Sequence, residues 1–141
     1  MTECPFPRIP FTRSLSMKIL VADDEEPMAR LVGRRLAAHG LEMVWARDGD
    51  EALTMIRTEP FAVVVLDYRM PRRDGLEVLR AMRDSKYQVP TVLMSGMGSL
   101  DVAVEAIRLG ASDYVIKDGN ATYLDLLPTV VLRLIEHERL I

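Results

Sequence analysis

The chain has 141 residues, of which 49% are hydrophobic and 28% are charged, and its formal net charge of −3 is made up of both signs. These values are typical of one globular domain and give no electrostatic reason to expect a nucleic-acid partner. The single cysteine, Cys4, excludes an internal disulfide and favours a reducing cytoplasm, and no apolar run approaches the roughly 20 residues of a membrane span.

The amino-terminal segment differs in composition from the rest of the chain. Residues 1–16 contain three prolines among scattered aromatic and basic side chains, and they show neither a helical nor a strand period. We expect a disordered leader over these residues, with a weak membrane or partner anchor as the alternative. Residues 17–141 are expected to form one folded domain.

Short apolar runs alternate with segments whose apolar residues recur at helical spacing. In chain order, the predicted elements are strand 18–22, helix 27–39, strand 42–46, a helix through 52–56, strand 61–66, helix 75–83, strand 89–94, helix 99–109, strand 114–116 and a helix from about 123 to the terminus. Pro27 suits a first helical turn, and Asp48 is a possible helix cap. Pro128 is expected either to begin a new first turn or to kink the last helix.

A strand followed by a helix is repeated five times in this pattern. Such a repeat predicts an α/β fold with a parallel sheet and helices on both of its faces. With right-handed crossovers, the doubly wound strand order 2-1-3-4-5 is the commonest for five strands. In that order the strand that ends before Asp23 and Asp24 lies beside the strand that ends before Asp67. The three acids are therefore expected to share one crevice.

Three carboxylates in one crevice repel each other, because two unit charges about 4 Å apart cost about 4 kcal/mol at an effective dielectric constant of about 20. A hard divalent cation such as Mg²⁺ would offset this repulsion, since it binds carboxylates and completes its shell with water and phosphate oxygens. Lys117, at the end of the strand 114–116, is suited to a phosphate oxygen. Acids, a metal ion and a lysine together indicate a site for phosphoryl chemistry.

Asp67 is the expected nucleophile of this site, since an ionised aspartate can attack phosphorus and form an acyl phosphate. Ser95, at the end of strand 89–94, could offer its hydroxyl to a phosphate oxygen. A simpler alternative for Asp23 and Asp24 is that they cap the helix that follows them.

Four sequence motifs, each at the end of a predicted strand, are similar to those of one known family. They are Asp23-Asp24, then Asp67-x-x-Met70-Pro71-x-x-Asp74-Gly75, then Ser95-Gly96, and finally Gly110-Ala111-x-Asp113-Tyr114-x-x-Lys117. In this order they resemble the response-regulator receiver domain of two-component signalling. The resemblance covers residues 17–141 and implies a flavodoxin-like fold.

The resemblance implies a phosphorylation-dependent signalling switch rather than an enzyme. Asp67 would accept a phosphoryl group from a phosphohistidine of a sensor histidine kinase or of a phosphotransfer protein. Mg²⁺ would be held by Asp23, Asp24, Asp67 and the backbone carbonyl of Arg69.

The resemblance also implies how the phosphoryl group is sensed. Ser95 and Lys117 would contact it, and Tyr114 would turn inward when Ser95 moves. The signal would leave through the face made by helix 99–109, strand 114–116 and the last helix, towards a downstream protein or a second copy of the chain.

The sequence departs from the family pattern at two places. Asp118 follows Lys117 where receivers usually have a proline after a cis peptide bond, and we expect a trans bond here because a non-proline cis bond costs about 2.5–4 kcal/mol. Arg69 and Met97 stand two residues beyond Asp67 and Ser95, where the family tunes the loss of phosphate. Their length predicts a shielded acyl phosphate and slow self-dephosphorylation.

The last helix is apolar over much of its circumference. Residues suited to a core stripe are Leu124, Leu127, Val131, Leu134 and Ile135. Further apolar residues fall outside this stripe, namely Leu126, Val130, Leu132, Leu140 and Ile141. They predict dimerisation or docking on a partner helix, or else a frayed terminus that lacks its neighbours.

Two other functions remain open from the sequence. An aspartyl-nucleophile phosphatase or phosphotransferase would use a similar sheet, but those enzymes commonly have a second aspartate at the position of Arg69. A receiver-like binding module that never takes phosphate is the other alternative.

Overall fold

The computed structural model of the protein describes residues 18–96, 100–118 and 122–139. Within them, five parallel strands form one sheet in the order β2-β1-β3-β4-β5, as the sequence predicted. The strands are β1 (Lys18–Ala22), β2 (Glu42–Ala46), β3 (Val63–Asp67), β4 (Thr91–Gly96) and β5 (Asp113–Lys117). The helices are α2 (Glu26–Ala37), α3 (Gly49–Thr58), α4 (Gly75–Asp84), α5 (Leu100–Arg108) and α6 (Thr122–Arg139).

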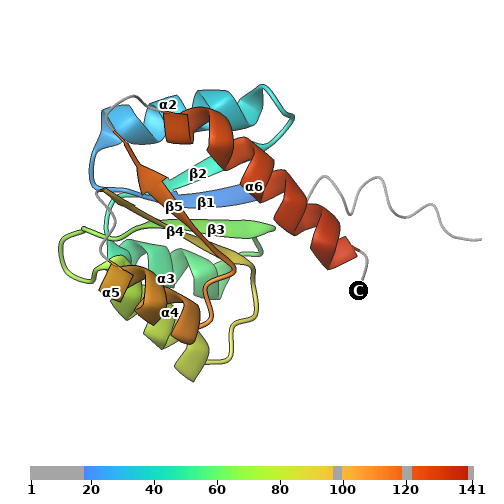
Figure 1. Ribbon diagram of the computed structural model, residues 1–141. Coiled ribbons are helices and arrows are strands. Elements are labelled where there is room, and N and C mark those ends of the chain that lie inside the picture. Colours follow the sequence, from blue (N-terminus) through green and yellow to red (C-terminus); the bar gives the residue numbers. More distant parts are fainter. Residues whose placement is uncertain (1–17, 97–99, 119–121, 140–141) are drawn as a thin grey trace, which may run out of the picture.

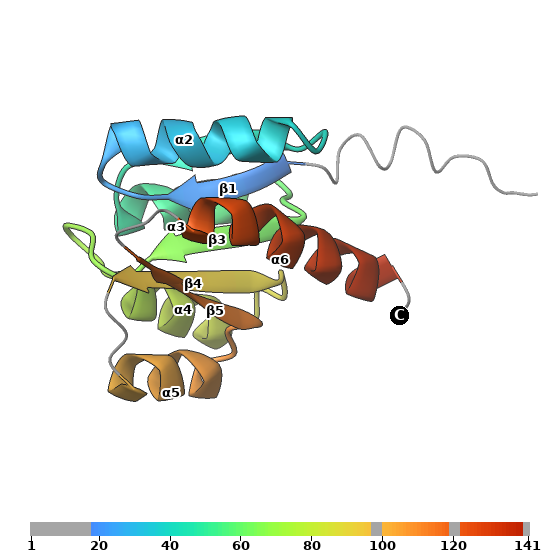
Figure 2. The same cartoon turned by 45° about the horizontal axis from the view of Figure 1, so that its top comes forward.

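The sheet lies between two layers of helices. Helices α2 and α6 cover one face, and α3, α4 and α5 cover the other (Figure 1). Figure 2 shows α5 on the same side of the sheet as α4, beside the edge strand β5, which it contacts. Alternate residues of β1 enter the two cores, with Ile19 and Val21 packed towards α2 and α6, and Leu20 and Ala22 towards α3 and α4.

The central strand β3 is buried along its whole length, which explains its continuous run of Val and Leu. It begins at Val63 and includes Asp67, whereas the predicted strand spanned residues 61–66. Strand β4 is likewise displaced towards the carboxyl end, because Pro90 has no N–H for the ladder and β4 begins at Thr91. These shifts place both Asp67 and Ser95 inside strands.

Helix α6 is continuous from Thr122 to Arg139, with Pro128 inside it, so of the two alternatives for Pro128 the new first turn is wrong. Val130 is buried in the core rather than on a second apolar face. In the described part of α6, the exposed large apolar residues are Leu126 and Leu132.

Some sequence-based expectations fall on other parts of the chain. The predicted leader, Met97, Leu140 and Ile141 lie outside the described residues. Within the described ranges no peptide bond is cis, so the Lys117–Asp118 bond is trans, as predicted. No helix in those ranges is both long enough and apolar enough to cross a membrane.

Candidate functional site

Asp67 is the last residue of β3 and is 6% exposed. The backbone beyond it stays close to the sheet, since the amide of Tyr68 donates to the carbonyl of Met94 at 2.7 Å. Gly75 begins α4 directly against this segment, and a Cβ on Gly75 would lie 2.7 Å from the carbonyl oxygen of Asp67. The chain therefore holds Asp67 at the carboxyl edge of the sheet, the position at which doubly wound proteins bind ligands.

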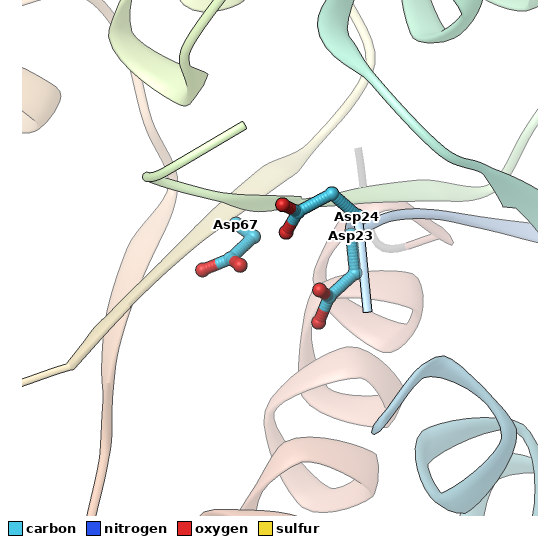
Figure 3. A group of neighbouring side chains, drawn as sticks. All are labelled: Asp23, Asp24 and Asp67. Atoms are coloured by element: carbon cyan, nitrogen blue, oxygen red, sulfur yellow. The ribbon is translucent and has the colours of Figure 1, made fainter. Parts of the chain in front are cut away.

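The three predicted acids meet at this edge. Asp23 and Asp24 follow β1, the neighbour of β3, and each of the three acids has a carboxylate oxygen within 4.8 Å of one on the other two. Figure 3 shows their side chains gathered beyond the strand ends. Asp23 is buried, at 1% exposed, whereas Asp24 is open to solvent.

Lys117 reaches the acids from the end of β5. Its Nζ lies 3.2 Å from Oδ2 of Asp67, to which it donates a hydrogen bond, and 3.6 Å from Oδ2 of Asp23. One ammonium therefore serves two buried carboxylates, and the cluster of three acids retains an excess of negative charge.

The pKa values of these groups reflect their burial and the charges around them. Burial and the nearby charge of Asp23 raise the pKa of Asp67 to about 6, although Lys117 partly opposes the shift. Burial also raises the pKa of Asp23, against the opposing effects of the Glu25 amide and Lys117. Burial lowers the pKa of Lys117, but its attraction to Asp67 and Asp23 outweighs this effect and leaves the pKa raised.

The two acids precede the helix α2 without being its N-cap residue. The N-cap of α2 is Glu25, whose side chain forms no capping hydrogen bond. Oδ1 of Asp23 instead accepts a hydrogen bond from the amide of Glu25 at 2.9 Å. Asp23 therefore binds the amide of the N-cap residue itself, while Oδ2 is left facing the other acids.

The acidic cluster fits a hard divalent cation. Oδ2 of Asp23 is buried and accepts no hydrogen bond from any described residue, although the Lys117 ammonium lies 3.6 Å away. Carboxylate oxygens with free lone pairs are the ligands that Mg²⁺ prefers.

The predicted sensing residues lie on the strands next to Asp67. Ser95 is 4% exposed on β4, and its hydroxyl donates to the carbonyl of Gly96 at 3.1 Å. The hydroxyl of Tyr114, on β5, is buried and has no hydrogen-bond partner among the described residues. Tyr114 packs with the core beneath α4 and α5, so its ring already points into the protein.

A cleft of about 630 Å³ opens beside the acids, and Arg69 lies on its rim. The guanidinium of Arg69 is exposed and sits 5.9 Å from the centre of the Tyr68 ring. Arg69 therefore lines the cleft beside the acids, while Met97 lies outside the described residues.

Three further residues contribute to the site without having been predicted. Tyr123, at the start of α6, lines the same cleft, and its hydroxyl lies 4.0 Å from the sulfur of Met28. Asp118 accepts a hydrogen bond from the amide of Thr122 at 2.9 Å and so holds the start of α6. Trp45, on β2, donates its indole N–H to the carbonyl of Asp23 at 2.7 Å.

Comparisons with known proteins agree with this geometry. A sequence model of the response regulator receiver domain matches residues 19–126. The regulatory protein AtoC of Escherichia coli (strain K12) is 37% identical over 117 residues, which are 83% of this chain and 25% of AtoC. The probable transcriptional regulator ycf27 of Cyanophora paradoxa is 37% identical over 123 residues, which are 87% of this chain and 51% of ycf27.

Solved structures show the same fold. The receiver domain of Francisella response regulator 1452 superposes with a TM-score of 0.79 at 30% identity, covering 86% of this chain and 98% of that chain. The present chain spans a quarter to a half of the length of the two curated relatives. Since the family model covers well over half of the chain, and the acids and Lys117 meet at one sheet edge, the chain belongs to the response-regulator receiver-domain family.

Proposed function

We propose that this chain is a phosphorylation-dependent switch in which Asp67 accepts a phosphoryl group from a phosphohistidine of a sensor histidine kinase or of a phosphotransfer protein. The observation that carries the proposal is the buried Asp67 carboxylate, gathered with Asp23, Asp24 and the ammonium of Lys117 in one cluster. Receiver domains are signalling modules of this kind, and the cluster supports the same role for this chain.

In the proposed reaction, one oxygen of Asp67 forms a bond to phosphorus while the phosphorus–nitrogen bond of the donor breaks. The electron pair of that bond returns to the imidazole nitrogen. Lys117, already hydrogen-bonded to Oδ2 of Asp67, would neutralise charge on the transferred group. Mg²⁺, held by Asp23, Asp24, Asp67 and the backbone carbonyl of Arg69, would supply further positive charge when bound.

Ser95 and Tyr114 are proposed to convert the phosphoryl group into a change of shape. Ser95 would exchange its hydrogen bond to Gly96 for one to a phosphoryl oxygen. Tyr114, whose buried hydroxyl has no partner among the described residues, would adjust its ring as Ser95 moves. Ser95 would therefore give up only its bond to Gly96, and Tyr114 would give up no hydrogen bond to a described residue.

The proposed output surface is the face made by α5, β5 and α6. It exposes large apolar residues, namely Leu100, Val104, Ile107 and Ile116. The three residues on α5 follow helical spacing and form one stripe. An apolar stripe flanked by charged residues is suited to a protein partner or to a second copy of the chain.

The test is incubation with Mg²⁺ and a small phosphodonor such as acetyl phosphate, followed by intact mass. We expect one added phosphoryl group, lost in Asp67→Asn and retained in the matched variant Asp74→Asn, whose carboxylate lies in the following loop and caps α4. No added phosphate, or a phosphate that survives Asp67→Asn, would contradict the proposal. Repeated turnover of a small phosphomonoester would favour the phosphatase alternative.

Slow loss of the phosphoryl group is part of the proposal, because the exposed Arg69 side chain lines the cleft through which an attacking water would have to pass. We predict that Arg69→Ala shortens the acyl-phosphate lifetime by about tenfold, the effect of about 1.4 kcal/mol on the barrier. The lifetime is measured by intact mass after the donor is removed. Arg72→Ala is the matched control, since Arg72 is in the same loop but pairs with Asp48. A lifetime of seconds in the unaltered protein would contradict the shielding role.

A further inference from the structure

Trp45 is the one tryptophan of the chain and lies on β2, outside the motifs that the family resemblance uses. It pairs in register with Val21 on β1, yet its side chain reaches forward to the end of β1. There its indole N–H donates to the main-chain oxygen of Asp23 at 2.7 Å. This distance is short for an N–H···O bond and indicates a well-formed contact.

Asp23 is held at three of its polar atoms. Its amide donates to the carbonyl of Ala46 at 3.0 Å, its carbonyl accepts from Trp45, and Oδ1 accepts from the amide of Glu25 at 2.9 Å. The remaining atom, Oδ2, is buried among the acids and accepts no hydrogen bond from the described residues. These three hydrogen bonds therefore orient Oδ2 of Asp23 towards the other acids.

The contact with Trp45 also restrains the backbone of Asp24. The carbonyl of Asp23 and the amide of Asp24 belong to one planar peptide unit, so fixing the carbonyl fixes that plane. Asp24 is exposed, and Glu25 after it caps α2 without a side-chain hydrogen bond in the described structure. The indole is thus the contact from β2 that holds the peptide unit joining both acids, beside the bond from the Glu25 amide to Oδ1 of Asp23.

We propose that Trp45 is a positioning residue that orients Asp23 and Asp24 for a divalent cation through its hydrogen bond to the Asp23 carbonyl. The inference rests on the Mg²⁺ site of the proposed function. Groups that orient metal ligands without touching the metal commonly change its affinity by about 10–100-fold when they are removed. Trp45 raises the affinity for the ion by holding its ligands in place, and it takes no part in the transfer of the phosphoryl group.

The test is the Trp45→Phe variant, which keeps an aromatic ring and removes the N–H. By calorimetry on the unphosphorylated chain, we expect the Kd for Mg²⁺ to rise by about tenfold. The rate of phosphorylation by acetyl phosphate should fall at low Mg²⁺ and equal that of the unaltered protein at saturating Mg²⁺. The matched control is Val44→Ala on the same strand, where Val44 packs against the core without a side-chain hydrogen bond to Asp23, and its Kd should be unchanged.

A second measurement needs no variant. The indole N–H resonance of the isotope-labelled protein should shift during a Mg²⁺ titration, with the same Kd that calorimetry gives. Equal Mg²⁺ affinity in Trp45→Phe, an equal loss in Val44→Ala, or an indole resonance that does not move would each overturn the positioning role while leaving the proposed function intact. Absence of Mg²⁺ binding by the unaltered protein would overturn both.

Discussion

At the scale of single residues, the most informative side chain is Asp67, because its surroundings disfavour the ionised carboxylate. Burial and the charge of Asp23 raise its pKa from 3.8 to about 6. Each pKa unit corresponds to about 1.4 kcal/mol, so the ionised form costs the metal-free protein up to about 3 kcal/mol. A phosphoacceptor gains from this arrangement, because a poorly solvated carboxylate is ready to bind a cation and to form a bond to phosphorus.

The sign of the resulting pH dependence follows from the direction of the shift. The unfolded chain releases the Asp67 proton near pH 3.8 and the folded protein only near pH 6, so the folded state binds more protons between these values. The contribution of Asp67 to stability is therefore fully present below about pH 4 and is lost as the pH rises through about 6.

We predict that Asp67→Asn stabilises the metal-free protein at pH 7.5 by roughly 1–3 kcal/mol, because the amide has no charge to lose hydration on burial or to repel Asp23. The gain should shrink towards zero as the pH falls to about 4. Urea unfolding in EDTA at both pH values measures the difference. Asp84→Asn, which removes an exposed carboxylate at the end of α4, is the control and should change little at either pH. An equal gain at pH 4 and pH 7.5 would show that charge is not the cause.

At the scale of secondary-structure elements, α4 approaches β3 closely enough to constrain the site. Asp74 and Glu77 form a capping box that fixes where α4 begins, and Gly75 follows directly against the backbone of Asp67. A Cβ on Gly75 would lie 2.5 Å from Cδ1 of Leu93 and 2.7 Å from the Asp67 carbonyl. The glycine thus lets the helix α4 pack directly against the backbone of Asp67.

We predict that Gly75→Ala destabilises the protein by about 1–3 kcal/mol, as overpacking against backbone does, and also lowers phosphate loading on Asp67. Gly33→Ala in α2 is the matched control. Its nearest neighbour would be the flexible end of Met43 at 3.0 Å, so the better helix propensity of alanine should make the change neutral or stabilising by up to about 1 kcal/mol. Urea unfolding and intact mass measure the two effects. Equal losses from both substitutions would contradict the close-approach argument.

At the scale of the whole molecule, the site residues lie at the carboxyl ends of neighbouring strands, whereas the helices that follow these strands lie on different faces of the sheet (Figure 1). Asp67, Ser95 and Lys117 lie on β3, β4 and β5, and the last two strands lead to α5 and α6. Helix α3 follows β2, which carries none of these three residues, and it contacts α4, β1 and β2. A phosphoryl group on Asp67 that acts through Ser95 and Lys117 would therefore act first on β4, β5 and the helices that follow them.

We predict that beryllofluoride, a mimic of the phosphoryl group, changes hydrogen-exchange rates mainly in α5 and β5 when it is added with Mg²⁺. Regions of few buried contacts respond first to a new interaction, and Leu100, Val104 and Ile107 of α5 are exposed. Mass spectrometry of exchanged peptides measures the change. Peptides from α3 should be unaffected, as should all peptides of Asp67→Asn. A uniform change over the whole chain would argue against a directed output face.

The amino-acid sequence by itself determined the strand order, the helix layers and the meeting of Asp23, Asp24, Asp67 and Lys117. Each of these depends on a local pattern, because an apolar run predicts a strand and the residue that follows it is carried to the carboxyl edge of the sheet. The same patterns predicted element boundaries less well. Pro90 moved the start of β4, and the core took Val130 of α6 out of the predicted second apolar face.

Only the tertiary structure decided how the acids are held. Trp45 and Tyr123 have no periodic or motif signal that points to the site, and they reach it because β2 lies beside β1 and because α6 begins next to the cleft. The buried Asp23 oxygen that accepts no hydrogen bond and the raised pKa of Asp67 likewise depend on burial and on charges brought together from distant parts of the chain. A sequence pattern records what each residue does along its own element, whereas hydrogen bonds between elements and desolvation arise only when the elements pack.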